Sequence, residues 1–176
     1  MVESKKTDDG LIRLAERRVF SERFKPLYAE GMGLVEEAAT YLDGDGRRAA
    51  KGLSRVAATL YAAESMRLTT RLMQIASWLL LQRAANSGEM TREQVAAEKS
   101  KIRLDTGSAD MAAPGWDELP ETFRDLVQRS LRLQRVVRRM DAEVYGDRDA
   151  APGRTAGDEN PVSAQIDLLK TAFGGR

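Results

Sequence analysis

The hydrophobic pattern is most continuous between Leu53 and Ala85, a stretch without proline or glycine. Apolar residues recur there in steps of three and four, which predicts one face of a helix. These residues are Leu53, Val56, Leu60, Ala63, Leu68, Leu72, Ile75 and Leu79. A second apolar line is formed by Met66, Met73 and Leu80. Because a helix that is apolar on two sides packs against more than one neighbour, we expect this stretch to be the central element.

Two more segments carry a helical seam, one on each side of the central stretch. The first begins near Phe20 and its seam is Phe20, Phe24, Leu27, Gly31, Leu34, Ala38 and Tyr41. The second starts at Pro120 and is closed by Gly146, with the seam Leu119, Phe123, Leu126, Ser130, Leu133, Val137, Met140 and Val144. Alternating steps of four and three are typical of helices that pack along their length. We interpret Gly31 as a point where a neighbouring backbone comes close.

The connections complete the predicted fold. Asp43 to Arg48 indicates a helix–turn–helix connection, and Thr91 with Gln94 forms a capping box that starts a short helix to about Ile102. Residues 105–118 are predicted to be a loop that Trp116 pins to the bundle. The chain is therefore expected to be all-α: an up-down-up three-helix bundle, with a short extra helix between the second and third helices and a flexible C-terminal tail.

This pattern divides the chain into three parts. Residues 1–18 are predicted to be a flexible N-terminal segment, residues 19–145 the three-helix bundle domain, and residues 146–176 a disordered linker with a short amphipathic tail segment. The apolar positions of the tail are Val162, Ile166, Leu169 and Phe173. Such a tethered segment suits the groove of a partner. It could equally fold back onto its own bundle or stay disordered.

Composition excludes several classes of function. The 176 residues contain no cysteine and no histidine, so disulfides, cysteine and histidine metal ligands, and Ser-His or Cys-His catalysis are impossible. No phosphate-binding or nucleophile motif is present. We expect no catalytic residue, no cofactor and no metal, and hence no enzyme. The charged N-terminus is not a signal peptide, and no apolar run is long enough to span a membrane.

Five residues of the central helix form a first candidate set for partner binding. Glu64, Arg67, Arg71, Gln74 and Trp78 are spaced three, four, three and four apart, and therefore share one helix face. Arginine and tryptophan on a rigid face have the composition of an interface hot spot. The plainer interpretation, which we weight more heavily, is an ordinary solvated face on which Glu64 pairs with Arg67 or Arg71.

The last bundle helix carries a second set, a stripe of arginines. Its members are Arg124, Arg129, Arg132, Arg135, Arg138 and Arg139. The candidates for partner binding are Arg132, Arg135 and Arg139. A basic helix face can follow phosphates, so a nucleic-acid-binding helical module is the alternative function. The acidic residues Glu22, Glu30, Glu36 and Glu37 of the first helix, or an acidic protein partner, explain the stripe without nucleic acid. The formal net charge of only +1 supports this view.

Three strings of this sequence resemble a known family. EGMGLVEEAATYLDGDGR (Glu30 to Arg47), AAESMRLTTRLMQIASWLLLQRA (Ala62 to Ala84) and GEMTREQ (Gly88 to Gln94) are similar to the alphaproteobacterial RcdA family, the regulators of CtrA degradation. The match covers the bundle from about Phe20 to Tyr145. The resemblance implies a dimeric three-helix bundle with a flexible C-terminal tail.

The resemblance also implies a function. Members of this family are non-enzymatic adaptors of the ClpXP protease in cell-cycle control. They act with the receiver-domain protein CpdR, which primes the protease, and bring cargo transcription factors or the cyclic-di-GMP-binding adaptor PopA. A homodimer in the cytoplasm, concentrated at a cell pole and without nucleic-acid or membrane partners, is expected on this basis. A general protein-interaction module is the broader alternative.

Overall fold

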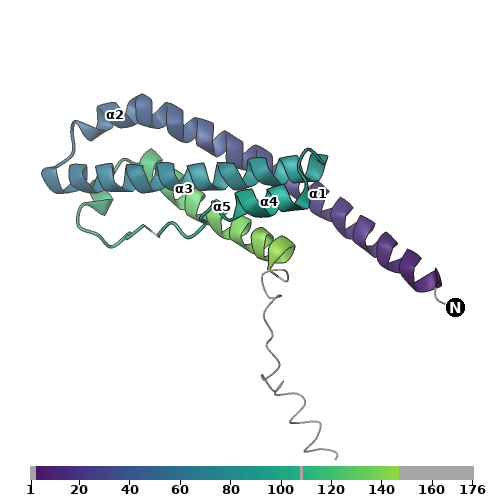
Figure 1. Cartoon of the computed structure of the whole chain (residues 1–176). Helices are drawn as coiled ribbons and strands as arrows, with labels where there is room; N and C mark the ends of the chain where they lie inside the picture. The colour runs from purple at the N-terminus through teal and green to yellow at the C-terminus, as the bar shows by residue number, and fades with distance from the viewer. Residues whose placement is uncertain (1–2, 108, 147–176) are drawn as a thin grey trace, which may run out of the picture. The chain divides into compact units, whose positions relative to one another are not determined.

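The computed structural model describes residues 3–107 and 109–146, and within them the side chains from Glu22 onward except Arg92. This part of the chain forms no strand. Its elements are α1 (Glu3–Asp43), α2 (Asp45–Ala50), α3 (Arg55–Ser87), α4 (Arg92–Lys99), the 3-10 helix η1 (Trp116–Glu118) and α5 (Glu121–Tyr145) (Figure 1). The prediction of an all-α bundle built on three long helices is confirmed. Across the described residues, every helix is too short or too polar to cross a membrane.

The helix α1 is longer than predicted. It begins at Glu3 and continues to Asp43, whereas the sequence led us to expect a flexible segment over residues 1–18 and a helix start near Phe20. Residues 3–18 contain no proline and are rich in glutamate, lysine, arginine, leucine and alanine, which favour helix. A helix nucleated by the packed part of α1 can therefore extend toward the N-terminus one residue at a time.

The connection after α1 also contains more helix than predicted. Gly44 separates α1 from the six-residue helix α2, where the sequence indicated only a turn. Asp45 stands at the start of α2 and forms an ion pair with Arg48, one turn later. Acidic residues near a helix start and basic residues near its end interact favourably with the helix dipole, which explains why this short stretch is helical.

Local capping signals set the ends of α3 and α4. The capping box of α4 confirms the prediction, whereas the Ser54 cap of α3 was not predicted. The Ser54 hydroxyl accepts a hydrogen bond from the Ala57 amide at 3.2 Å, and Gly88 ends α3 in the left-handed region with φ 75°. At α4, Thr91 and Gln94 form both hydrogen bonds of the capping box. The helix stops at Lys99, three residues before the predicted end at Ile102.

The buried face of α3 differs from the predicted seam in its first half. Leu68, Leu72, Ile75 and Leu79 are buried as expected. Ahead of them the core contains Ala57, Tyr61 and Glu64, while Val56 is 56% exposed. Met66, Met73 and Leu80 are also exposed, so the second apolar line covers no other part of the described chain. Because α3 is apolar nearly all round, periodicity alone could not determine which side faces the core.

The third long helix runs in the opposite direction to the predicted one. Tyr41, near the end of α1, stacks at 6.4 Å on Phe123 at the start of α5, which makes α1 and α5 antiparallel. Phe123 also contacts Tyr61 near the start of α3, with ring centroids 4.5 Å apart. Further along both helices, Arg71 of α3 donates a hydrogen bond to Ser130 of α5. Helices α3 and α5 are therefore parallel, and the bundle is up-down-down.

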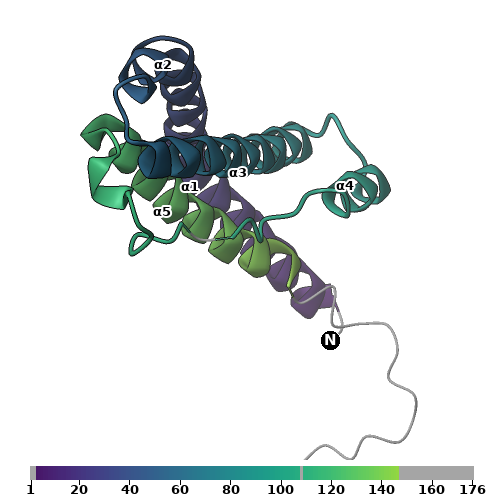
Figure 2. The same ribbon diagram turned by 90° about the vertical axis from the view of Figure 1, so that its left-hand side faces the viewer.

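The long connection between α3 and α5 permits this topology. A short loop joins antiparallel neighbours, whereas a long crossover can return the chain to the end of the bundle at which the preceding helix began. The crossover here leaves α3 at Gly88, passes through α4, and returns to the start of α3 (Figure 2). There Gly115 has φ 88°, and a Cβ atom on it would lie 3.0 Å from the Cα of Ala57. Trp116 is buried, as predicted for the residue that pins this loop.

The tail positions Val162, Ile166, Leu169 and Phe173 lie outside the described residues. Their proposed roles therefore stay predictions, as do the boundaries after residues 18 and 145.

Candidate functional site

The five polar candidates of α3 do not form one exposed face. Glu64 and Arg71 are fully buried and Trp78 is only 2% exposed. Gln74 is half-buried, and Arg67 is exposed. The shared face predicted from the spacing exists, but its centre is directed into the bundle. Neither the solvated face that we weighted more heavily nor the exposed hot spot therefore describes Glu64, Arg71 and Trp78, which are buried.

Trp78 contributes to the core rather than to a surface. Its ring lies 6.4 Å from that of Phe24 on α1, and Phe24 in turn lies 5.9 Å from Tyr28. Arg83, one turn after Leu79 on α3, donates a hydrogen bond to the Tyr28 hydroxyl at 3.0 Å and stacks over the same ring. Aromatic pairs of this kind fix the contact between α1 and α3.

Glu64 and Arg71 form the centre of a buried polar cluster. Arg71 donates from Nη1 to the Ser130 hydroxyl at 2.8 Å and from Nη2 to the Gly107 carbonyl at 3.0 Å. Glu64 is paired with Arg67, whose side chain reaches the solvent. Burial lowers the pKa of Arg71, and the charge of Glu64 opposes that shift. The cluster thus places a charged pair inside an otherwise apolar bundle and leaves Glu64 Oε2 and Arg71 Nε without a hydrogen bond among the described residues.

Two members of this cluster were missed by sequence reasoning. Ser130, which accepts the hydrogen bond from Arg71, donates one to the Val127 carbonyl at 2.7 Å and is fully buried. Gln134 donates to the Leu104 and Thr106 carbonyls at 3.0 Å and 3.2 Å. A signal was present, because Ser130 is the only polar residue in the predicted seam of α5. A hydroxyl at a seam position requires a buried partner, and none could be named from the sequence.

The arginine stripe of α5 divides into paired and unpaired members. Arg129 makes a two-bond contact with Glu37 at 2.8 Å and 2.7 Å, and a further bond with Asp125. Arg124 lies 3.8 Å from Asp117. Arg132, Arg135 and Arg138 are exposed, and no ion pair joins them to a described residue. Charge matching with the first helix therefore explains Arg129 alone.

Exposed Arg132, Arg135 and Arg139 lie three and four residues apart on α5. The apolar Val136 beside them is 47% exposed. A row of cations next to an apolar side chain is suited to a partner with acidic and apolar groups. The candidate positions predicted on α5 are thus accessible, and whether they bind a partner stays a prediction.

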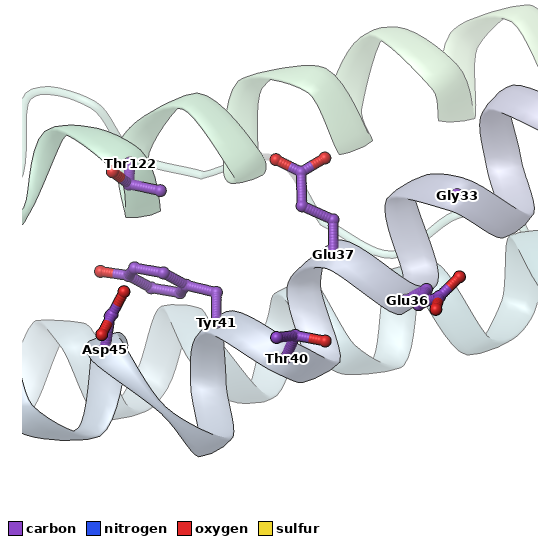
Figure 3. Close-up of a pocket in the computed structure, with 7 residues that line it drawn as sticks. All are labelled: Gly33, Glu36, Glu37, Thr40, Tyr41, Asp45 and Thr122. Atoms are coloured by element: carbon purple, nitrogen blue, oxygen red, sulfur yellow. The ribbon is translucent and has the colours of Figure 1, made fainter.

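A shallow acidic pocket lies where α1 and α2 meet the start of α5 (Figure 3). Its lining is Gly33, Glu36, Glu37, Thr40, Tyr41, Asp45 and Thr122. Glu37 extends from α1 toward α5, where Arg129 holds it, and this contact lowers the pKa of the Glu37 carboxyl. Burial raises the pKa of Tyr41. The described residues include no group of carboxylates arranged to hold a metal ion.

Comparison with known proteins places this bundle in a family. The sequence profile of a family described as "Protein of unknown function (DUF1465)" matches residues 15–173. The crystal structure of RcdA from Caulobacter crescentus CB15 is similar, with a TM-score of 0.56 and 51% sequence identity over 68% of this chain and 88% of that chain. The chain belongs to the RcdA family. A comparison with curated proteins found no match.

Membership of the RcdA family agrees with the three strings from which the resemblance was inferred. They lie on α1 and α2, on α3, and from the end of α3 to the start of α4. The RcdA relationship suggests a role in protein interaction.

Proposed function

We propose that this protein is a non-enzymatic adaptor that promotes proteolysis of cell-cycle regulators by ClpXP. The observation that carries the proposal is the 51% identity with RcdA over 88% of that chain. The resemblance implies the finer roles: priming of the protease by CpdR, and delivery of cargo transcription factors directly or through PopA. A cytoplasmic site of action, concentrated at a cell pole, belongs to the same proposal.

The chemistry of the chain is compatible with this role. Histidine and cysteine, which supply common proton shuttles and nucleophiles, are missing, and a contribution to proteolysis through binding needs neither. An adaptor accelerates a reaction by raising the effective concentration of cargo near the protease, which requires two binding surfaces and no reacting group.

We assign the exposed apolar line of α3 to a homodimer. Val56, Met66, Met73 and Leu80 are 56%, 74%, 64% and 48% exposed. Met66, Met73 and Leu80 follow one another at steps of seven, the repeat by which two helices pack along a shared seam. An apolar line of this length has no partner within the described residues, and a second copy would cover it symmetrically.

The arginine face of α5 and the tail supply the remaining contacts of the proposal. Arg132, Arg135 and Arg139 would bind an acidic protein surface of cargo or of the second adaptor. The tail, through Val162, Ile166, Leu169 and Phe173, would engage the primed protease. Arg67 and Gln74 are the α3 candidates that remain accessible.

The deciding experiment measures the half-life of a cargo transcription factor with purified ClpXP and unphosphorylated CpdR, with and without the full chain. Three variants run in parallel: a chain ending at Tyr145, Ile166→Asp with Phe173→Asp, and Arg132→Ala with Arg135→Ala. Arg55→Ala, another exposed arginine, is the matched control. We expect the full chain and the control to shorten the half-life, and the three variants to lose most of that effect.

Each other outcome removes a specific part of the proposal. Equal activity of the chain ending at Tyr145 would remove the tail from the mechanism. Equal activity of the double arginine variant would remove the α5 face. No acceleration by the full chain on any cargo would contradict the adaptor function. A gel-shift with DNA and RNA then tests the nucleic-acid alternative, whose affinity must fall steeply with salt.

A further inference from the structure

Residues 102–107 of the crossover form a strap whose main chain is held by side chains of α3 and α5. Gln74 accepts from the Arg103 amide at 2.9 Å. Gln134 donates to the Leu104 and Thr106 carbonyls at 3.0 Å and 3.2 Å, and Arg71 donates to the Gly107 carbonyl at 3.0 Å. All four contacts go to the backbone of the strap and none to its side chains, so they place no restriction on its sequence.

The strap has the form of an extended peptide bound in a site. No backbone–backbone hydrogen bond involves residues 103–107 within the described chain, and these residues have no regular secondary structure. Their exposure alternates: Ile102, Leu104 and Thr106 are half-buried, whereas Arg103, Asp105 and Gly107 are exposed. Alternating side-chain burial with main-chain hydrogen bonds is the way in which proteins recognise extended peptides.

Two of the groups that hold the strap are themselves buried. Arg71 is fully buried and Gln134 is 6% exposed. Arg71 is also oriented from the far side by Ser130. By contrast, the strap places no fully buried side chain against the helices. These two groups of the site are therefore more deeply buried than the side chains of the strap.

Two atoms of the buried polar cluster have no hydrogen-bond partner among the described residues. These atoms are Arg71 Nε and Glu64 Oε2. Buried donors and acceptors without partners cost free energy. A different occupant that fills the half-buried positions with larger apolar side chains would gain by burial.

We propose that the seam between α3 and α5 is a binding site for an extended peptide segment of a partner protein, and that the strap occupies this site when no partner segment is bound. The segment would carry apolar side chains at alternate positions, where Ile102 and Leu104 lie. Gln74, Gln134 and Arg71 would bind its main chain. This inference goes beyond the protease proposal and does not depend on it, since the test below contains no protease.

The probe is a fluorescein-labelled peptide with the sequence of residues 99–107, KSKIRLDTG. Its binding is followed by fluorescence polarisation with the full chain, the strap variant Ile102→Ser with Leu104→Ser, and the same variant with Gln134→Ala added. In the wild type the strap competes at an effective concentration on the order of millimolar, so the peptide binds weakly. We expect the strap variant to bind at least about tenfold more tightly, and Gln134→Ala to abolish that gain.

Two controls isolate the site. Arg138→Ala, exposed and one turn after Gln134, should leave peptide binding by the strap variant unchanged. A peptide with serine in place of both apolar residues should not bind. Circular dichroism verifies helical content, and the single variant Leu104→Ser replaces the double variant if that one unfolds.

Three results would overturn the proposal. The first is equal peptide binding by the wild type and the strap variant. The second is a gain in affinity that survives Gln134→Ala. The third is a strap variant whose sedimentation shows a higher mass without peptide binding, because this would mean that two copies exchange their straps.

Discussion

At the scale of single residues, the chain uses polar groups inside the bundle. Glu64 and Arg71 both lie in the core and are shielded from water. No ion pair between the two is described. Buried charges are costly unless other groups satisfy them. Here Arg67, Ser130 and the Gly107 carbonyl do so, which ties α3 to both α5 and the crossover.

Replacing Arg71 with alanine should destabilise the protein by about 3 kcal/mol, because the change leaves the Glu64 carboxylate buried with one neighbouring cation fewer. It also removes the hydrogen bonds to Ser130 and Gly107. Urea unfolding followed by circular dichroism, at one fixed protein concentration, measures the free energy of unfolding. Arg135→Ala is the matched control, with an expected change within about 0.5 kcal/mol. Equal values for the two variants would contradict the structural role of Arg71.

The contact between Glu37 and Arg129 predicts a pH dependence. The hydrogen bonds from Arg129 lower the pKa of Glu37 below its ordinary value of 4.5. A carboxyl whose pKa is lower in the folded state adds stability above the pKa of the unfolded state, and this stability is lost as the pH falls through the folded-state value. Both side chains are partly exposed, at 35% and 47%, so the contribution is at most about 1 kcal/mol.

Glu37→Gln tests this dependence. We expect the variant to be less stable than the wild type at pH 7, and the difference to shrink as the pH falls below 4.5. Urea unfolding from pH 3 to pH 7 provides the comparison, with Glu36→Gln as the control because Glu36 makes no described ion pair. A difference that stays constant over this range would exclude Glu37 as its source.

At the scale of elements, two glycines of α1, Gly31 and Gly33, differ in the space around them. Gly31 is buried at the contact with α3 and α5, where a Cβ atom would meet the Leu79 side chain and lie 3.7 Å from Leu133. The close approach predicted for this glycine exists, but it involves the side chain of Leu79 rather than a backbone. Gly33, two residues later, faces open space.

Alanine at these two positions should therefore have opposite effects. Gly33→Ala gains helix propensity without a clash and should stabilise the protein by up to about 1 kcal/mol. Gly31→Ala gains the same propensity but overpacks a buried contact, which costs about 1–3 kcal/mol, so we expect net destabilisation. Thermal and urea unfolding of the two variants, side by side, makes the comparison. Stabilisation by both would mean that α1 and α3 are less closely packed than the structure has them.

At the scale of the whole molecule, the exposed line of α3 leads to a prediction on oligomeric state. Met66→Glu with Met73→Glu places two charges on the proposed dimer seam and should convert the dimer to a monomer in sedimentation equilibrium. Met111→Glu with Val136→Glu is the matched control, because it adds the same two charges to exposed apolar positions outside α3. A monomeric wild type, or a double variant that remains dimeric, would remove α3 from the dimer.

The features that the sequence determined by itself are those set by neighbours three or four residues apart. The Gly88 stop, the Thr91–Gln94 capping box and the apolar seam of α5 depend on such neighbours, and the structure has all three. The existence of three long helices follows from the same local signals. The family resemblance rests on strings within these helices.

Only the tertiary structure decided the direction of α5, the side of α3 that faces the core, and the burial of Glu64 and Arg71. The direction depends on where the crossover returns, and Gly115 meets Ala57 across more than fifty residues of chain. The orientation of α3 could not be inferred because apolar side chains surround it on several sides. The orientation of α3 then determined which of its polar residues are exposed and which are buried. It also placed Arg71 where, together with Gln134, it holds the strap.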